Sequence, residues 1–184
     1  MTSMDNVRAF FALLGKHGSQ DVTEILKLFV GDNDAAGPPN IGLTTGNKKT
    51  AGPQFNKVVG IMDLFSTLQN SFSQYALDTA PDGNPNTAQL MTGGNMISAE
   101  AMLTTGNWKS HWAPTTVAPS PPLSLIDGSD EGGGGGKPTK IPVCAVFTMD
   151  DPGSDKIINL ALYFDRWKLA NDMWDKQNPQ HIDK

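Results

Sequence analysis

The sequence contains little cysteine: Cys144 is the only one among 184 residues. A single thiol cannot form an internal disulfide, which excludes the cross-linked scaffold typical of small secreted proteins. Cys144 lies inside the apolar run Ile141–Met149, where a cysteine can be a nucleophile or a small hydrophobic residue. Its apolar neighbours favour the second interpretation, so we expect Cys144 to be buried in a strand.

Positive charge and long apolar runs are also scarce. Lysine and arginine number 14 against 19 acidic residues, which gives a formal net charge of −5, whereas nucleic-acid binding needs a basic surface. No apolar run approaches the ~20 residues of a membrane-spanning helix. The short run Val7–Gly15 contains Arg8 and lacks a cleavage pattern, which is typical of an amphipathic helix rather than a signal peptide. We expect a soluble, cytoplasmic protein without nucleic-acid or membrane partners.

Residues that bind metals or nucleotides are not grouped in the sequence. The sequence has three histidines, which are far apart: His17, His111 and His181. Their spacing predicts no metal site, because zinc ligands usually form short motifs. Gly132–Thr139 resembles a phosphate-binding loop, but Glu131 stands where the motif needs a glycine and Pro138 where it needs Ser or Thr. We expect no cofactor.

The first part of the chain has the apolar spacing of three amphipathic helices. Their apolar residues are Val7, Phe10, Phe11 and Leu14 in the first, Val22, Ile25, Leu26 and Phe29 in the second, and Phe55, Val58, Met62 and Phe65 in the third. Asp21 and Glu24 form a capping-box arrangement at the start of the second helix. Pro53 suits the first turn of the third.

Alternating apolar residues between turn residues predict strands, mostly after residue 70. The predicted strands are a short one near Ile41–Thr45, then Ser71–Asp78, Trp108–Ala118, Ile141–Met149 and Lys156–Asp165. Thr87–Thr104 fits either a helix or two bent strands, and Gly93-Gly94-Asn95 in its middle favours two strands. The turn-rich Asp150–Asp155 predicts that the last two strands form an antiparallel hairpin.

Helices followed by antiparallel strands are typical of the α+β class. We predict three N-terminal helices packed in a cone against a strongly curved, mostly antiparallel sheet. The length fits a single domain, 1–184. Residues 127–140 (DGSDEGGGGGKPTK) are predicted to form a flexible Gly-rich loop.

The C-terminal third resembles a known family. Ile157–Asp165 (IINLALYFD), with Leu169 four residues later, is similar to the last strand of SnoaL-like proteins, a branch of the nuclear-transport-factor-2-like superfamily. Segments 52–69, 104–108 and 142–151 are similar to the family's third helix, central strand and penultimate strand. The resemblance implies a small-ligand pocket inside the cone and a homodimer formed through the outer face of the sheet.

Two positions depart from the cyclase-like members of that family. Those members often have a histidine after the central-strand glycine, where this sequence has Trp108, and a catalytic carboxylate where it has Leu162. Leucine cannot transfer a proton, and both departures weigh against cyclase chemistry. The resemblance therefore implies where a site would lie and not which reaction it would perform.

His111 is one of two candidates for proton transfer. Strand alternation places it on the face opposite Trp108 and Trp112. If that face lines a cavity, an imidazole is suited to act as a general base, since it titrates near neutral pH. If that face meets water, His111 has no such role.

Asp165 is the second candidate. It ends a strand in which Asn159, Tyr163 and Asp165 share a face, and such a row of polar groups can line a pocket. The alternative is that Asp165 caps the following segment through its backbone N–H groups.

The aromatic and methionine residues of the predicted helices would form either a filled core or the wall of a pocket. They are Phe10, Phe11, Phe55, Met62 and Phe65. In a pocket they would supply the apolar lining, while Trp112, Asn159 and Tyr163 would orient a ligand.

We therefore predict binding of a small hydrophobic or aromatic molecule, with cofactor-free acid–base chemistry of the isomerase, dehydratase or hydrolase type. A ligand carrier without catalysis would have the same pocket. The alternative of another class is a non-catalytic, dimeric interaction or adaptor module.

Under the catalytic interpretation, Asp165→Asn or His111→Ala abolishes turnover and leaves the thermal midpoint nearly unchanged, because only a proton-transfer group is lost. Parallel measurements of turnover and of the thermal midpoint test this. A large loss of stability would instead assign either residue a structural role.

Overall fold

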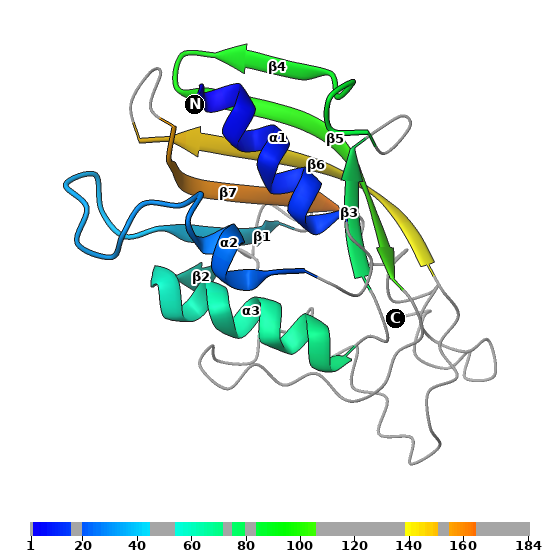
Figure 1. Cartoon of the computed structure of the whole chain (residues 1–184), viewed down its shortest axis with the longest axis horizontal. Helices are drawn as coiled ribbons and strands as arrows, with labels where there is room; N and C mark the ends of the chain where they lie inside the picture. The colour runs from blue at the N-terminus through cyan, green and yellow to red at the C-terminus, as the bar shows by residue number, and fades with distance from the viewer. Residues whose placement is uncertain are drawn as a thin grey trace, which may run out of the picture.

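The computed structural model of the chain describes residues 2–15, 20–44, 54–71, 75–79, 84–105, 139–150 and 155–164. Within them the elements are α1 (Ser3–Leu14), α2 (Val22–Leu26), β1 (Asn40–Thr44), β2 (Gln54–Asn56), α3 (Lys57–Ser71), β3 (Tyr75–Thr79), β4 (Leu90–Gly93), β5 (Met96–Thr105), β6 (Thr139–Met149) and β7 (Ile157–Phe164) (Figure 1). The predicted α+β class is confirmed. The predicted strand Trp108–Ala118 and residues 127–138 lie outside the described residues.

The described strands form one curved, mixed sheet. Their order is β2-β1-β7-β6-β5-β3, and β4 pairs with β5 beside β3. The β1–β7 pair is parallel and the other described pairs are antiparallel, as predicted for most of the sheet. The helices lie on one face, which we call the inner face, and the opposite face is the outer face (Figure 1). In the described part of the chain, no helix is long and apolar enough to cross a membrane.

Two hairpins organise the second half of the sheet. The ambiguous segment forms β4 and β5, which pair antiparallel and are joined by a turn in which Gly94 has φ 61°. Glycine adopts this left-handed conformation without strain. The predicted hairpin of β6 and β7 is also present, with a register irregularity between Thr148 and Met149.

Helix α1 begins as a capped amphipathic helix. The Asp5 N–H donates to Thr2 Oγ1 at 3.2 Å, and the Thr2 N–H donates to Asp5 Oδ2 at 2.9 Å, so the first turn is closed by a capping box. Its buried side chains include all four of the predicted stripe: Val7, Phe10, Phe11 and Leu14. The prediction of this helix is confirmed.

The start of the third helix differs from the prediction. Gln54–Asn56 forms β2, in which Phe55 pairs with Ile41 of β1, and α3 begins only at Lys57. Lys57 has a φ of 66°, and its N–H donates to the Pro39 carbonyl at 2.8 Å rather than continuing a helix toward Pro53. The Val58 N–H then donates to Asp32 Oδ1 at 2.7 Å, which caps the helix from a distant loop.

This change of boundary alters the face that α3 buries. The buried apolar side chains of α3 are Ile61, Leu64 and Phe65, whereas Met62 is 46% exposed. The predicted stripe is therefore wrong at Met62. The helical spacing of that stripe was counted from Phe55. Phe55 lies in a strand, where side chains on one face repeat every two residues, so a count that starts there does not apply to α3.

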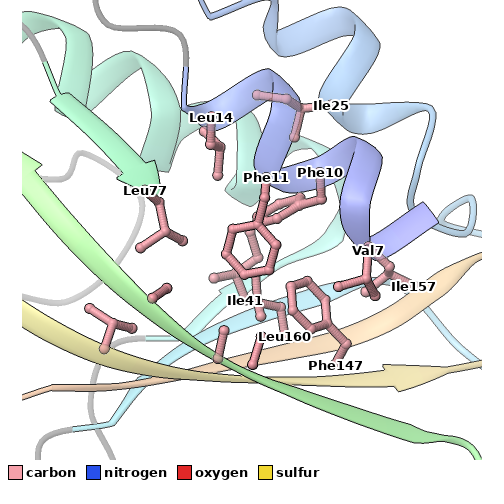
Figure 2. Packing of buried hydrophobic residues seen from close by; sticks show 14 of the residues in the cluster. Val7, Phe10, Phe11, Leu14, Ile25, Ile41, Leu77, Phe147, Ile157 and Leu160 are labelled. Atoms are coloured by element: carbon pink, nitrogen blue, oxygen red, sulfur yellow. The ribbon is translucent and has the colours of Figure 1, made fainter. Parts of the chain in front are cut away.

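The core is centred on aromatic residues between α1 and β6. Phe147 of β6 lies 5.3 Å from Phe10 and 5.7 Å from Phe11 between ring centroids, in edge-to-face arrangements. Phe10 also contacts Phe29, which follows α2, at 6.2 Å. Figure 2 shows Phe10 and Phe11 descending from α1 toward Phe147 and Leu160 of the sheet. Such ring pairs are favourable beyond the area that they bury.

A buried amide joins α1 to the beginning of the last strand. Asn6 is 2% exposed, and its Nδ2 donates to the carbonyls of Leu28, at 3.0 Å, and Asp155. The Ile157 N–H donates to the Leu28 carbonyl at 2.9 Å, and the Val30 N–H donates to the Ile157 carbonyl at 3.0 Å. The segment after α2 is therefore held against α1 and β7 together.

The expected burial of Cys144 is wrong. Along β6 the odd-numbered side chains from Ile141 to Met149 are buried, and the even-numbered Cys144 is exposed on the outer face. The run is apolar on both faces, so its composition did not indicate which face would be covered.

Phe147→Ala should lower the free energy of unfolding by about 3–5 kcal/mol, because it removes the ring that both α1 phenylalanines contact. Denaturant unfolding measures this, with Val59→Ala on the exposed side of α3 as a control that changes stability by about 0.5 kcal/mol or less. Equal losses in the two variants would contradict the central position of Phe147.

Candidate functional site

The two ends of the inner face differ in how completely their apolar side chains are covered. Beside the first turns of α1, Val7, Phe147 and Leu160 are fully buried (Figure 2). The other end is formed by β3, the second half of β5, the start of β6 and the end of β7, and we call it the β3 end. There three inner-facing apolar side chains of β5 and β7 are only partly buried: Leu103, Leu162 and Phe164.

Strand register groups these residues into one surface. Leu103 is paired with Ile141 of β6, and Phe164 is paired with Val143, two residues further along β6. Leu77 of β3 lies opposite Leu103 on the other side and points into the core (Figure 2). Apolar side chains from four neighbouring strands thus meet at the β3 end, and Leu103, Leu162 and Phe164 are the partly exposed ones among them.

Three hydroxyl groups are buried on the same inner face. Tyr75, Thr79 and Thr105 are at most 3% exposed, and their side-chain oxygens have no hydrogen-bond partner among the described residues. Leaving such a group unpaired costs about 1–3 kcal/mol. Nearly all buried polar groups in proteins have a partner, so each of these hydroxyls requires an explanation.

Two of the three residues are paired in the strand register. Tyr75 at the start of β3 is directly opposite Thr105 at the end of β5, whereas Thr79 is opposite Ala101, four residues along β3. Four strand residues correspond to about 13 Å. Gln20 Nε2 donates to the Tyr75 carbonyl and so holds the backbone of Tyr75 in place.

The phenol of Tyr75 is a hydrogen-bond donor at neutral pH. Burial raises its pKa above the ordinary value of a tyrosine, because the charged phenolate would be poorly solvated there. Tyr75 therefore keeps its proton, and its hydroxyl can donate a hydrogen bond.

The predicted pocket residues do not all belong to this surface. Phe10, Phe11, Phe55 and Phe65 are buried in the core cluster, with Phe10 and Phe11 packed on Phe147. Met62 is exposed on α3.

Asn159 and Tyr163 lie on the outer face, opposite Thr148 and Cys144 of β6, so the predicted grouping of these two with the phenylalanines is corrected. The inner face of β7 is formed by Leu160, Leu162 and Phe164, because burying this apolar row is more favourable than burying the polar one. Asn159 Oδ1 instead accepts a 2.7 Å hydrogen bond from Asn40 on the neighbouring strand.

The two proton-transfer candidates, Asp165 and His111, lie outside the described residues, as does Trp112. Their roles stay predictions. In the part of the chain that the structure describes, no three His, Cys, Asp or Glu side chains gather as a metal site would require.

Sequence reasoning missed Tyr75 and Thr105. Tyr75 was within the predicted strand Ser71–Asp78, and Thr105 was within segment 104–108, which resembles the family's central strand. They are 30 positions apart, and only the β3–β5 register places them side by side. A hydroxyl without a partner leaves no pattern in the sequence, since the partner's absence is a property of the packed interior.

Comparison with known proteins gives matches in structure alone. No family model matches the sequence, and no curated protein does. Among solved structures, an NTF2-like protein from Burkholderia thailandensis E264 superposes with a TM-score of 0.60 at 14% identity, over 95% of this chain and 99% of that one. A SnoaL-like protein from Jannaschia Sp. CCS1 gives 0.60 at 12% identity, over 93% and 90%.

A third match is TerC co-crystallized with polyporic acid, with a TM-score of 0.58 at 11% identity over 93% of this chain and 97% of that one. Identities this low establish similarity of fold and not of activity. The matches extend over nearly the whole of each chain, as the resemblance in the C-terminal strands implied. The chain therefore has the nuclear-transport-factor-2-like fold.

Proposed function

We propose that this protein binds a small hydrophobic or aromatic molecule between its helices and the inner face of its sheet, at the β3 end. The observation that carries this proposal is the partial exposure of Leu103, Leu162 and Phe164, three apolar side chains that face inward on neighbouring parts of the sheet. Apolar side chains left partly exposed in a concave layer gain free energy when an apolar ligand covers them.

The structural neighbours support a small-molecule role. One of them was crystallised with polyporic acid and another with trimethylamine. These ligands belong to those proteins; for this chain they support only the general class of occupant.

Acid–base catalysis is the finer part of the proposal. Asp165, which follows Phe164 in the sequence, and His111 are the groups that we propose for proton transfer in an isomerase, dehydratase or hydrolase reaction.

Binding can be tested by blocking the surface. Leu103→Trp should weaken binding of planar aromatic compounds at least about tenfold, since a larger side chain occupies the ligand's space. Titration calorimetry with compounds that raise the thermal midpoint of the wild type measures the effect.

Leu90→Trp is the matched control, because Leu90 is also a partly buried leucine but lies on β4, away from the β3 end. Equal weakening in both variants, or the absence of any stabilising compound, would contradict the proposal.

We also infer that a second copy of the chain covers the outer face. Adjacent strands there expose large side chains: Met91 is 62% exposed, Met96 48% and Tyr163 44%, and Cys144 is exposed between Tyr163 and Glu100. Exposed apolar groups gathered on one face favour association. In a symmetric dimer, each of the two copies buries this same face against the other.

Met96→Glu should convert a dimer into a monomer in sedimentation velocity, because a carboxylate would be buried without a partner. The same substitution at Met62, exposed on α3, should leave the dimer intact. A wild-type protein that sediments as a monomer would contradict the dimer and leave the ligand proposal untouched.

A further inference from the structure

Three carboxamide side chains form a hydrogen-bonded row on the outer face of β2, β1 and β7. Asn40 Nδ2 donates to Gln54 Oε1 at 2.9 Å and to Asn159 Oδ1 at 2.7 Å. A carboxamide nitrogen carries two hydrogens, so Asn40 uses both to hold its neighbours. Asn40 Oδ1 is enclosed and has no partner within the described residues. The partly buried amides of Gln54 and Asn159 are therefore the ones that an external ligand can reach.

Gly42 allows the Gln54 amide to lie against the sheet. A Cβ built at Gly42 would be 2.9 Å from both Oε1 and Nε2 of Gln54, a separation that real Cβ atoms essentially never show. A side chain at this position would therefore displace the amide. The absence of a Cβ at Gly42 and the hydrogen bond from Asn40 together hold Gln54 in one place.

Tyr163 is an exposed aromatic residue beside this row. It is 44% exposed and lies on the same face of β7 as Asn159, four residues further along, or about 13 Å. Between them on that face is Ala161, which is paired with Gly42 of β1. No large side chain of β7 therefore separates the aromatic ring from the amides.

The described part of this surface carries no charge. The side chains of β1, β2 and β7 that face outward there are Asn40, Gln54, Asn56, Asn159, Ala161 and Tyr163. An ion bound among them would lose its hydration without gaining an opposite charge. Their polar groups instead both donate and accept hydrogen bonds. The surface therefore favours a neutral ligand that is rich in hydroxyl groups.

A neutral sugar chain has the two chemical features that this surface would recognise. Each hydroxyl is a donor and an acceptor, so two adjacent hydroxyls can pair with the nitrogen and the oxygen of one carboxamide. The C–H groups of a sugar ring pack on the face of an aromatic ring, which is the negative part of its quadrupole. Because about 13 Å of strand separates Asn159 from Tyr163, occupying both ends requires linked sugars.

We propose that the outer surface of β1, β2 and β7 binds a short, neutral oligosaccharide along β7, with one ring on Tyr163 and another on the amides of Gln54 and Asn159. This inference goes beyond the proposed ligand of the inner face and does not depend on it. The methionines assigned to the second copy lie on β4 and β5, on the other side of β6, and Tyr163 borders both surfaces.

The test titrates the full chain calorimetrically with glucose, maltotriose, cellotriose and tri-galacturonate. A single ring reaches only one end of the surface, so the better neutral trisaccharide should bind at least about tenfold more tightly than glucose. It should also bind at least about tenfold more tightly than tri-galacturonate, whose carboxylates find no opposite charge. Equal binding in either comparison, or no binding of any of these sugars, would overturn the proposal.

Gly42→Ala separates a binding role of the amides from a structural one. The added Cβ displaces only the flexible end of the Gln54 side chain, so the thermal midpoint should change little while the affinity for the trisaccharide falls at least about fivefold. Gly31→Ala is the matched control, because a Cβ there meets nothing within 4 Å. Unchanged affinity in Gly42→Ala, an equal loss in Gly31→Ala, or a marked fall in the midpoint of Gly42→Ala would overturn the assignment.

A second readout uses the two tyrosines of the chain, Tyr75 and Tyr163. With tyrosine labelled with ¹³C at Cζ, the preferred trisaccharide should shift the Tyr163 signal and leave that of Tyr75, on the inner face, in place. A shift of the Tyr75 signal alone would place the sugar on the inner face and overturn the proposal.

The variant Met96→Glu tests whether the surface stays open in the native protein. It should bind the preferred trisaccharide as tightly as the wild type does, because Met96 lies on β5 and not on the sugar surface. Binding by Met96→Glu but not by the wild type would show that the second copy covers the amides, and the proposal would fail.

Discussion

The contact between α1 and the C-terminal part of β6 decides which face of the sheet is the inside. Phe10 and Phe11 place their rings against Phe147, and this packing makes the odd-numbered residues of β6 the buried ones. Because β6 pairs with both β5 and β7, the register also fixes which side chains of β5 and β7 face the helices. A shift of one residue would exchange the two faces of a strand, so the aromatic contact and the register depend on each other.

The consequences reach residues far from that contact. On β7 the register turns Leu160, Leu162 and Phe164 toward the helices, and it turns Tyr163 outward beside Cys144. On β5 it places Thr105 inward, opposite Tyr75. The same packing therefore determines three features: the apolar side chains on the inner face, the inward position of Tyr75 and Thr105, and the exposed methionines on the outer face. The ligand proposal concerns the inner face and the dimer proposal concerns the outer one.

The helices cover the inner face unevenly, and the proposed ligand site is at the less covered end. The start of α1 is held down by Asn6, whose amide reaches the carbonyls of Leu28 and Asp155. Side chains near that attachment are fully buried, while Leu103, Leu162 and Phe164 at the β3 end are partly exposed. Small-molecule sites are mostly lined by apolar side chains, and the proposed position at this end agrees with that rule.

Local features of the sequence determined much of this protein. The stripe of α1, its capping box and the β6–β7 hairpin follow from the spacing of apolar, capping and turn residues, because each depends on neighbours a few positions away. The α+β class followed from the order of these elements. The resemblance of the last strands to SnoaL-like proteins indicated the fold that the structure confirms.

Only the tertiary structure decided which face of an ambiguous strand is buried and where α3 begins. Cys144 lies in a run that is apolar on both faces, and Phe55 became a strand residue because Ile41 was available to pair with it. The pairing of Tyr75 with Thr105 joins two segments that are 30 residues apart. Local patterns carry no information about such long-range pairings, because their free energy comes from surfaces that meet only when the whole sheet has formed.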